Sequence, residues 1–179
     1  YEFSVLSASY CQKGSAYFQD ARVLAKMEIL ARFLTFSQVE DGTVNIGNLE
    51  SPPDTAFIVE IVCTATSNLQ KQSLAVLQPL LGQLKNLLLK AGEALRTGGI
   101  HTPNHRWVIC AALSQLNHLY PDKKYVARIN EWLGEGIFQD ADGHYPERSG
   151  TYSMVENTAF ITMARLLSKT ELLPYVRKN

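Results

Sequence analysis

The sequence predicts an all-α protein, and three observations support this fold class. Apolar residues recur at helical spacing along most of the 179 residues. No stretch shows the apolar–polar alternation of a half-buried strand. Two similar polar loops precede two apolar segments about 103 residues apart, which indicates a repeated helical unit. We therefore expect antiparallel helical hairpins that together form an incomplete α/α toroid.

Two helices separated by a long polar loop are predicted in the first third of the chain. Residues 15–39 carry apolar side chains at helical spacing with charges between them, and Asp41-Gly42 ends this segment. The loop 43–53 is rich in Asn, Gly, Ser and Pro. Asp54 or Thr55 then caps a helix that is apolar on nearly all sides, so we expect that helix to be buried.

The same periodicity predicts further helices in the rest of the chain. Gly98-Gly99 ends the first of these helices, and Tyr120-Pro121 separates the next two. A second polar loop, residues 140–150, precedes the helix predicted over 152–167. The expected segments are 73–95, a helix that starts at Pro103, 123–137, 152–167, and a short one over 171–176.

The repeat predicts how these helices pack. Thr55 and Thr158 hold equivalent places, and the helix that starts at Pro103 lies midway between them, which gives a period of about 51 residues. Each unit combines an amphipathic helix, a polar loop and a more uniformly apolar helix. We expect about three such hairpins within a single domain, residues 1–179, with the apolar helices inside. The loops that enter the inner helices would then lie on one face.

Composition gives no indication of a nucleic-acid, membrane or metal partner. Lys+Arg and Asp+Glu each number 17, so the formal net charge is zero. No apolar run reaches the length of about 18 residues that a transmembrane helix needs. The three cysteines and four histidines lack metal-ligand spacing, and we predict no metal and no cofactor. Asp140-x-Asp142-Gly143 lacks the glutamate of a calcium loop, because Thr151 stands at the twelfth position.

The segment 101–107 is the strongest candidate for a functional site. Pro103 fits the first turn of a helix, which places Asn104, His105 and Arg106 at its open N-terminal end. Free backbone N–H groups and the helix dipole favour anions at such a position. A simple capping turn with solvated polar residues is the alternative interpretation.

With these residues in place, the second half of the chain resembles the catalytic toroid of heparinase II/III-like polysaccharide lyases, including the related oligoalginate lyases. The resemblance rests on the Asn104-His105 pair at the start of an inner helix and on Tyr152 one hairpin later, within Glu147-Arg148-Ser149-Gly150-Thr151-Tyr152. It covers residues 100–167 at the level of motifs. It implies a β-sandwich domain after the toroid, absent from this chain, and a periplasmic or secreted protein.

The resemblance also implies a chemistry and a partner, an acidic polysaccharide or oligosaccharide. A lyase removes the C5 proton of a uronic acid and expels the 4-O-linked sugar by β-elimination. Asn104 would then neutralise the uronate carboxylate together with His105, and Tyr152 would act as general acid and base. The remaining candidates for substrate binding are Arg106, Arg148, Trp107, Glu147 and Asp54.

Other interpretations remain open at this point. Trp107 begins an apolar run and suits the core as well as a sugar-stacking role. Tyr152 could be an ordinary aromatic at a helix start, and Arg148 could pair with Glu147 in solvent. A glycoside hydrolase on the same scaffold would need two carboxylates, for which Asp54, Asp142 and Glu147 are available. A non-catalytic glycan-binding module of helical repeats is the third possibility.

Overall fold

The computed structural model describes residues 1–179 and confirms the all-α fold class. No strand is present, and Gln38 and Val44 form one isolated antiparallel bridge. The chain runs through α1 (Glu2–Cys11), α2 (Ala21–Phe36), α3 (Pro52–Gln70), the 3-10 turn η1 (Ala75–Leu77), α4 (Gln78–Thr97), α5 (Pro103–Leu119), α6 (Lys123–Gly134), α7 (Gly150–Leu167), the 3-10 turn η2 (Thr170–Leu172) and α8 (Leu173–Lys178).

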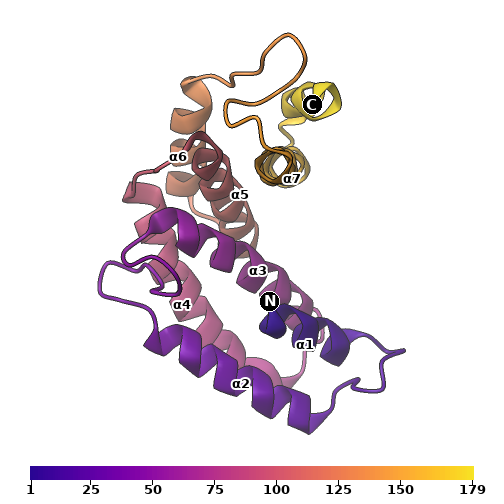
Figure 1. Ribbon diagram of the computed structural model, residues 1–179. Helices are drawn as coiled ribbons and strands as arrows, with labels where there is room; N and C mark the ends of the chain where they lie inside the picture. The colour runs from indigo at the N-terminus through magenta and orange to yellow at the C-terminus, as the bar shows by residue number, and fades with distance from the viewer.

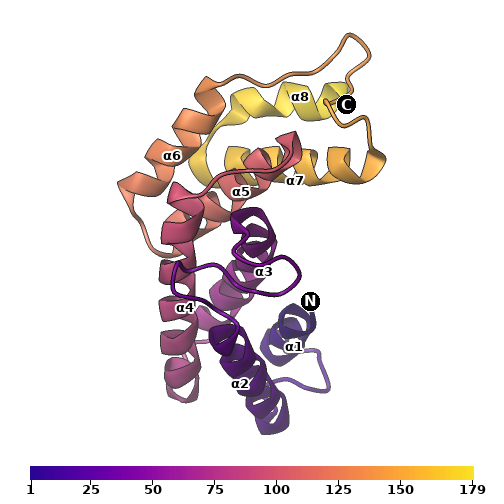
Figure 2. The ribbon, with the colours of Figure 1, turned by 60° about the vertical axis from the view of Figure 1, so that its left-hand side comes forward.

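The helices lie in two rows (Figure 1). In one row α1 packs on α3, α3 on α5, and α5 on α7. In the other row α2 packs on α4 and α4 on α6, and each of these helices also packs on the preceding helix of the first row. The short α8 covers α7, as the turned view shows (Figure 2). Antiparallel hairpins are therefore present, with the less amphipathic helices α3, α5 and α7 in one row and the more amphipathic α2, α4 and α6 in the other.

Capping side chains fix where the helices begin, and they correct two predicted boundaries. The first predicted helix starts at Ala21 rather than at Ser15, because the Asp20 carboxylate accepts a hydrogen bond from the backbone N–H of Arg22. The second starts at Pro52, earlier than expected, because Ser51 caps it and two prolines occupy its first positions. Pro52 and Pro53, which were predicted to lie in the loop, are thus part of the helix.

The helix α1 was missed by sequence reasoning, so the chain holds four helical hairpins rather than about three. Its apolar residues do not gather on one clear face, which removed the periodic signal. It is nevertheless well packed against α3. Phe3 and Tyr10 are buried, and the hydroxyl of Ser7 donates to the carbonyl of Ala65 at 3.2 Å.

The core is centred on α5, where ten of the seventeen residues are buried. Trp107 packs edge-on against Phe160 of α7, with ring centroids 5.0 Å apart, and Tyr145 adds a second aromatic contact to Phe160. Leucines of α4 complete the core on the side away from α7, and two of them, Leu84 and Leu88, are fully buried. This continuous core gives α3, α5 and α7 fixed relative positions.

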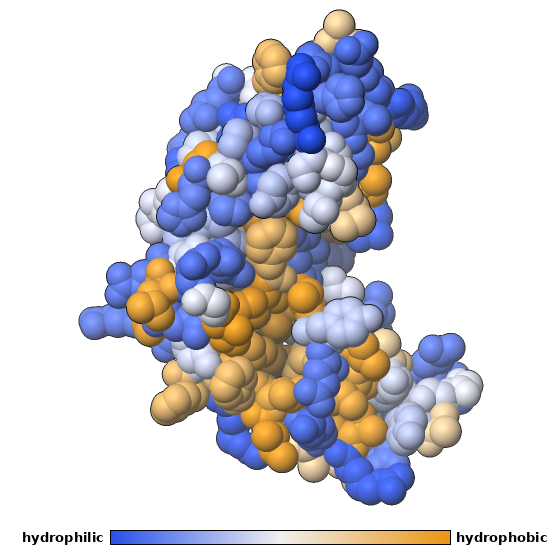
Figure 3. Space-filling model, viewed as in Figure 1, coloured by the Kyte–Doolittle hydropathy of each residue, from blue (hydrophilic) through white to orange (hydrophobic).

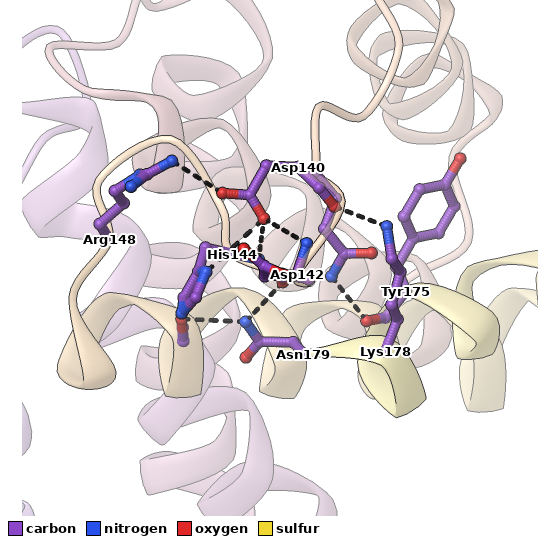
Figure 4. Close-up of polar contacts among 10 residues, drawn as sticks. Asp140, Asp142, His144, Arg148, Tyr175, Lys178 and Asn179 are labelled. Carbon is purple, nitrogen blue, oxygen red and sulfur yellow. Dashed lines mark hydrogen bonds and ion pairs between the residues drawn. The ribbon is translucent and has the colours of Figure 1, made fainter.

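The repeat predicted from the sequence is visible as a repeated contact. Gln38 donates from Nε2 to the carbonyl of Leu87 in α4 at 3.0 Å, and Gln139 donates from Nε2 to the carbonyl of Tyr175 in α8 at 2.9 Å. Each loop is therefore hydrogen-bonded to the second helix that follows it, which is α4 for the first loop and α8 for the second. Figure 4 shows the second copy, in which Lys178 and Asn179 also hold the loop.

The glycine of each loop is packed in the same way. Gly42 and Gly143 both adopt positive φ, at 97° and 94°. An added Cβ would lie 2.3 Å from the carbonyl oxygen of Lys90 at Gly42 and 2.2 Å from that of Lys178 at Gly143. The two Asp-Gly turns thus hold corresponding positions, and both positions require glycine.

The surface of the molecule is divided by polarity. Figure 3 shows apolar side chains gathered in the lower half of that view, over α1, α2 and α3, while the upper half is mostly polar. The exposed apolar residues of this part include Tyr1, Val5, Ile29, Phe33, Phe36 and Phe57. None of the helices combines the length and the apolar composition that crossing a membrane requires.

Candidate functional site

The first turns of α3, α5 and α7 lie at the same end of the helix rows. Glu147, which precedes α7, is hydrogen-bonded to Asn104 in the first turn of α5. Asp54 in the first turn of α3 interacts electrostatically with His101 and His105. The structure therefore brings Asp54, Asn104, His105 and Glu147 together. The repeat predicted that the loops entering the inner helices lie on one face, but it did not predict the contact of Glu147 with Asn104.

The start of α5 already binds a carboxylate, which comes from the chain itself. Oε1 of Glu147 accepts hydrogen bonds from the backbone N–H of Asn104 at 2.9 Å and from its Nδ2 at 2.7 Å. The same Nδ2 donates to Oγ1 of Thr102 at 3.0 Å. Asn104 is 1% exposed, so both of its amide hydrogens are engaged below the surface. This is the anion-binding arrangement expected of a helix N-terminus.

His105 and Asp54 form the more open side of the site. The desolvation of His105 by partial burial lowers the pKa of its imidazole, and His101 acts in the same direction, while Asp54 opposes it. The two histidine rings meet edge to face with centroids 5.8 Å apart. Partial burial of Asp54 opposes its ionisation, but hydrogen bonds from Ser51 and Asn48 outweigh it and lower the pKa of the carboxyl group. Asp54 is thus an anion, and His105 favours the neutral form.

Arg106 and Trp107 point into the protein rather than toward a ligand. The guanidinium of Arg106 pairs with Glu135 just beyond α6 at 3.0 Å and lies 4.2 Å from the centre of the Trp107 ring. Trp107 is 2% exposed. The core role is therefore the correct one for Trp107, and its sugar-stacking role is excluded in this conformation. Arg106 thus links the start of α5 to the end of α6 through Glu135.

Tyr152 and Arg148 lie at the start of α7, and each is solvent-accessible. Tyr152 is 45% exposed, and its hydroxyl makes no hydrogen bond within the chain. Arg148 adopts a left-handed backbone conformation with φ of 46°. Its guanidinium pairs with Asp140 at 2.9 Å rather than with Glu147 (Figure 4). The alternative pairing of Arg148 with Glu147 is thus not formed, and Arg148 instead makes a contact inside the polar loop.

Asp140 organises this loop as a turn. Its Oδ1 accepts hydrogen bonds from the backbone N–H groups of Asp142 and His144, at 3.1 Å and 2.8 Å. Ligand atoms of Asp140, Asp142 and His144 lie within 4.8 Å of one another. Because Oδ1 is engaged by the backbone and Oδ2 by Arg148, the carboxylate already serves the turn, in line with the Asp-Gly turn predicted from the sequence.

Glu156 is the ionisable residue that sequence reasoning missed. It is 0% exposed on α7, and neither carboxyl oxygen has a hydrogen-bond partner. Burial, followed by the charge of Glu147, raises the pKa of Glu156 to about 8, while Arg106 opposes the shift. Oε2 of Glu147 is also buried without a partner. A lone glutamate within the apolar run of α7 was the signal that could have drawn attention to it.

The arrangement offers a carboxylate-binding helix start, a histidine with a lowered pKa, and a free phenol one helix away. Comparison of the chain with family models, with curated proteins and with solved structures finds no match.

Proposed function

We propose that the chain is part of the α/α toroid of a polysaccharide lyase that cleaves a uronic-acid-containing polysaccharide by β-elimination. The observation that carries this proposal is the first turn of α5, where Asn104 presents a backbone N–H and a side-chain amide to a carboxylate. The two-row packing of helical hairpins supports it, as does the resemblance of the Asn104, His105 and Tyr152 motifs to heparinase II/III-like lyases.

In the proposed reaction, the uronate carboxylate of the substrate takes the position that Glu147 holds in this structure. Amide donors there stabilise the enolate that forms when the C5 proton leaves, and Asn104 does so without titrating. Glu147 must then move aside. His105 lies next in sequence and adds a further polar contact at the same helix start.

Tyr152 would complete the elimination. Its phenol gives a proton to the leaving oxygen as the C4–O bond breaks and the C4–C5 double bond forms. For one C5 epimer, the same group starts as the phenolate, takes the C5 proton and then delivers that proton to the leaving oxygen. Asp54, Glu147 and Arg148 would border the subsites, and the β-sandwich domain that the resemblance implies would supply a histidine on the opposite sugar face. A secreted or periplasmic location belongs to the same proposal.

The direct test follows the ultraviolet absorbance of a 4,5-unsaturated uronate over a panel of acidic polysaccharides. The enzyme should be the protein that includes the implied β-sandwich domain. Absorbance should rise with at least one substrate, and Tyr152→Phe should abolish the rise. Tyr17→Phe is the matched control, because Tyr17 is also exposed, at 53%, and precedes α2. Full activity in Tyr152→Phe would remove Tyr152 from the mechanism.

The two other functions would give different products. A hydrolase would release new reducing ends without ultraviolet absorbance, and its activity would depend on loop carboxylates. Of the acids it would need, Asp54 is hydrogen-bonded to Ser51 and Asn48, and Glu147 would have to leave Asn104, as it would in the lyase reaction. A binding module would retain an acidic glycan without forming any product.

A further inference from the structure

A cavity lies at the opposite end of α3, α5 and α7 from the candidate site. Its volume is about 350 Å³, which falls within the range of small-ligand pockets. The residues that line it come from the last turns of the three helices, whereas the candidate site uses their first turns. No residue belongs to both.

Three basic side chains from three different helices meet in this cavity. Lys71 is the C-terminal cap of α3, His118 lies in the last turn of α5, and Arg165 lies in the last turn of α7. None of them makes an ion pair or a side-chain hydrogen bond within the chain. A basic residue at a helix C-terminus interacts favourably with the helix dipole, which accounts for each of them singly. All three side chains are exposed, and their convergence on one cavity places several hydrogen-bond donors where a single anion can contact them together.

No acidic side chain lines the cavity. The acidic residue that comes nearest along α3 is Glu60, which accepts a hydrogen bond from Nε2 of Gln115 at 3.3 Å. Burial raises the pKa of Glu60 to about 7, so its carboxyl group is only partly ionised near neutral pH. The cavity therefore keeps a positive balance in a chain whose formal net charge is zero.

The neutral part of the lining narrows the class of ligand. Ser67, Asn68 and Gln115 provide hydroxyl and amide groups, which both donate and accept hydrogen bonds. Such groups match the hydroxyls of a sugar, while a guanidinium and an ammonium match an oxyanion. We infer that this cavity binds a small acidic sugar, with its carboxylate against Lys71 and Arg165 and its hydroxyls against the amides. This inference does not rest on the proposed lyase activity.

The test is a titration of the ¹⁵N-labelled chain with sodium glucuronate at low ionic strength, followed by NMR. The side-chain amide signals of Asn68 and Gln115 should shift saturably, while that of Gln83, which lies outside the cavity and donates to Thr35, stays in place. In Lys71→Gln/Arg165→Gln the affinity should fall by at least about tenfold, because two charge-assisted contacts are lost. Lys13→Gln/Arg177→Gln removes the same two charge types from exposed positions and should bind as the wild type does. Thermal unfolding checks that both variants are folded.

Three results would overturn the assignment. Absence of a saturable shift at Asn68 and Gln115 would exclude an acidic-sugar site in this cavity. Equal weakening in the two double variants would reduce the effect to net charge. Inorganic sulfate that binds as tightly as glucuronate would exclude a role for the sugar hydroxyls, and glucose that binds as tightly would exclude a role for the cations.

Discussion

The carboxylate of Glu147 lies 2.7 Å from Nδ2 of Asn104 and 2.9 Å from its backbone nitrogen, so one acidic side chain joins the starts of α5 and α7. The contact links residues 43 positions apart in the sequence. It satisfies two donors that the fold has removed from water, and it fixes the geometry on which the proposed site depends. Its loss should therefore be measurable without any substrate.

We expect Glu147→Ala to lower the free energy of unfolding by about 1–3 kcal/mol, because the buried amide and backbone N–H of Asn104 lose their acceptor. Urea denaturation at neutral pH measures the change. Glu40→Ala is the matched control, since Glu40 is exposed and has no hydrogen-bonding partner. Equal stability of the two variants would mean that the contact contributes nothing.

Glu156 should make the protein less stable as the pH rises. Burial raises the pKa of its carboxyl group in the folded state to about 8, above its value of about 4.3 in an unfolded chain. Between these values the folded state binds the proton more tightly, so the free energy of unfolding falls with increasing pH and levels off above pH 8. The full effect is on the order of 5 kcal/mol.

The variant Glu156→Gln isolates this effect. It should be more stable than the wild type at pH 8.5 by a few kcal/mol, with a smaller difference at pH 5. Glu60→Gln tests the same effect at a lower pH, because burial raises the pKa of Glu60 to about 7. The loss of stability that Glu60 causes should therefore level off about one pH unit below that of Glu156. A Glu156→Gln profile parallel to that of the wild type would show that this carboxyl group is not shifted.

The glycines of the two Asp-Gly turns should resist substitution. Gly42→Ala and Gly143→Ala each place a Cβ against a carbonyl oxygen of a following helix and should cost roughly 3 kcal/mol or more. Gly47→Ala separates the two causes, because Gly47 also has positive φ, at 108°, but has open space around it. It should cost only about 1 kcal/mol. Equal costs at all three positions would show that the close contact adds nothing to the backbone strain.

The cysteines should differ in their reaction with a thiol reagent such as DTNB. Burial raises the pKa of the Cys63 and Cys110 thiols, and both are about 1% exposed or less. Cys11 is partly exposed, although burial also raises the pKa of its thiol. One thiol per chain should therefore react in the folded state and three in denaturant. Three rapid reactions without denaturant would contradict the packing of α3 and α5.

The helices were predictable because their signal is local, whereas the site was predictable only in outline. Apolar periodicity located α2 to α7, but α1 lacked a clear apolar face. The repeat indicated that Asp54 and Asn104 lie at the same end. The pairing of Asn104 with Glu147 and the inward direction of Trp107 depend on how α5 packs against α7, which no local pattern encodes.

The row α1–α3–α5–α7 determines how local unfolding at one end affects the rest of the molecule. Each helix of the row contacts its immediate neighbours, so stability is close to a sum of pairwise interfaces along a line. The ends of such a line can open while the middle stays folded. Amide hydrogen exchange should therefore be fastest in α1 and α8 and slowest in α5, and a lesion in α1 should leave the Asn104–Glu147 contact intact.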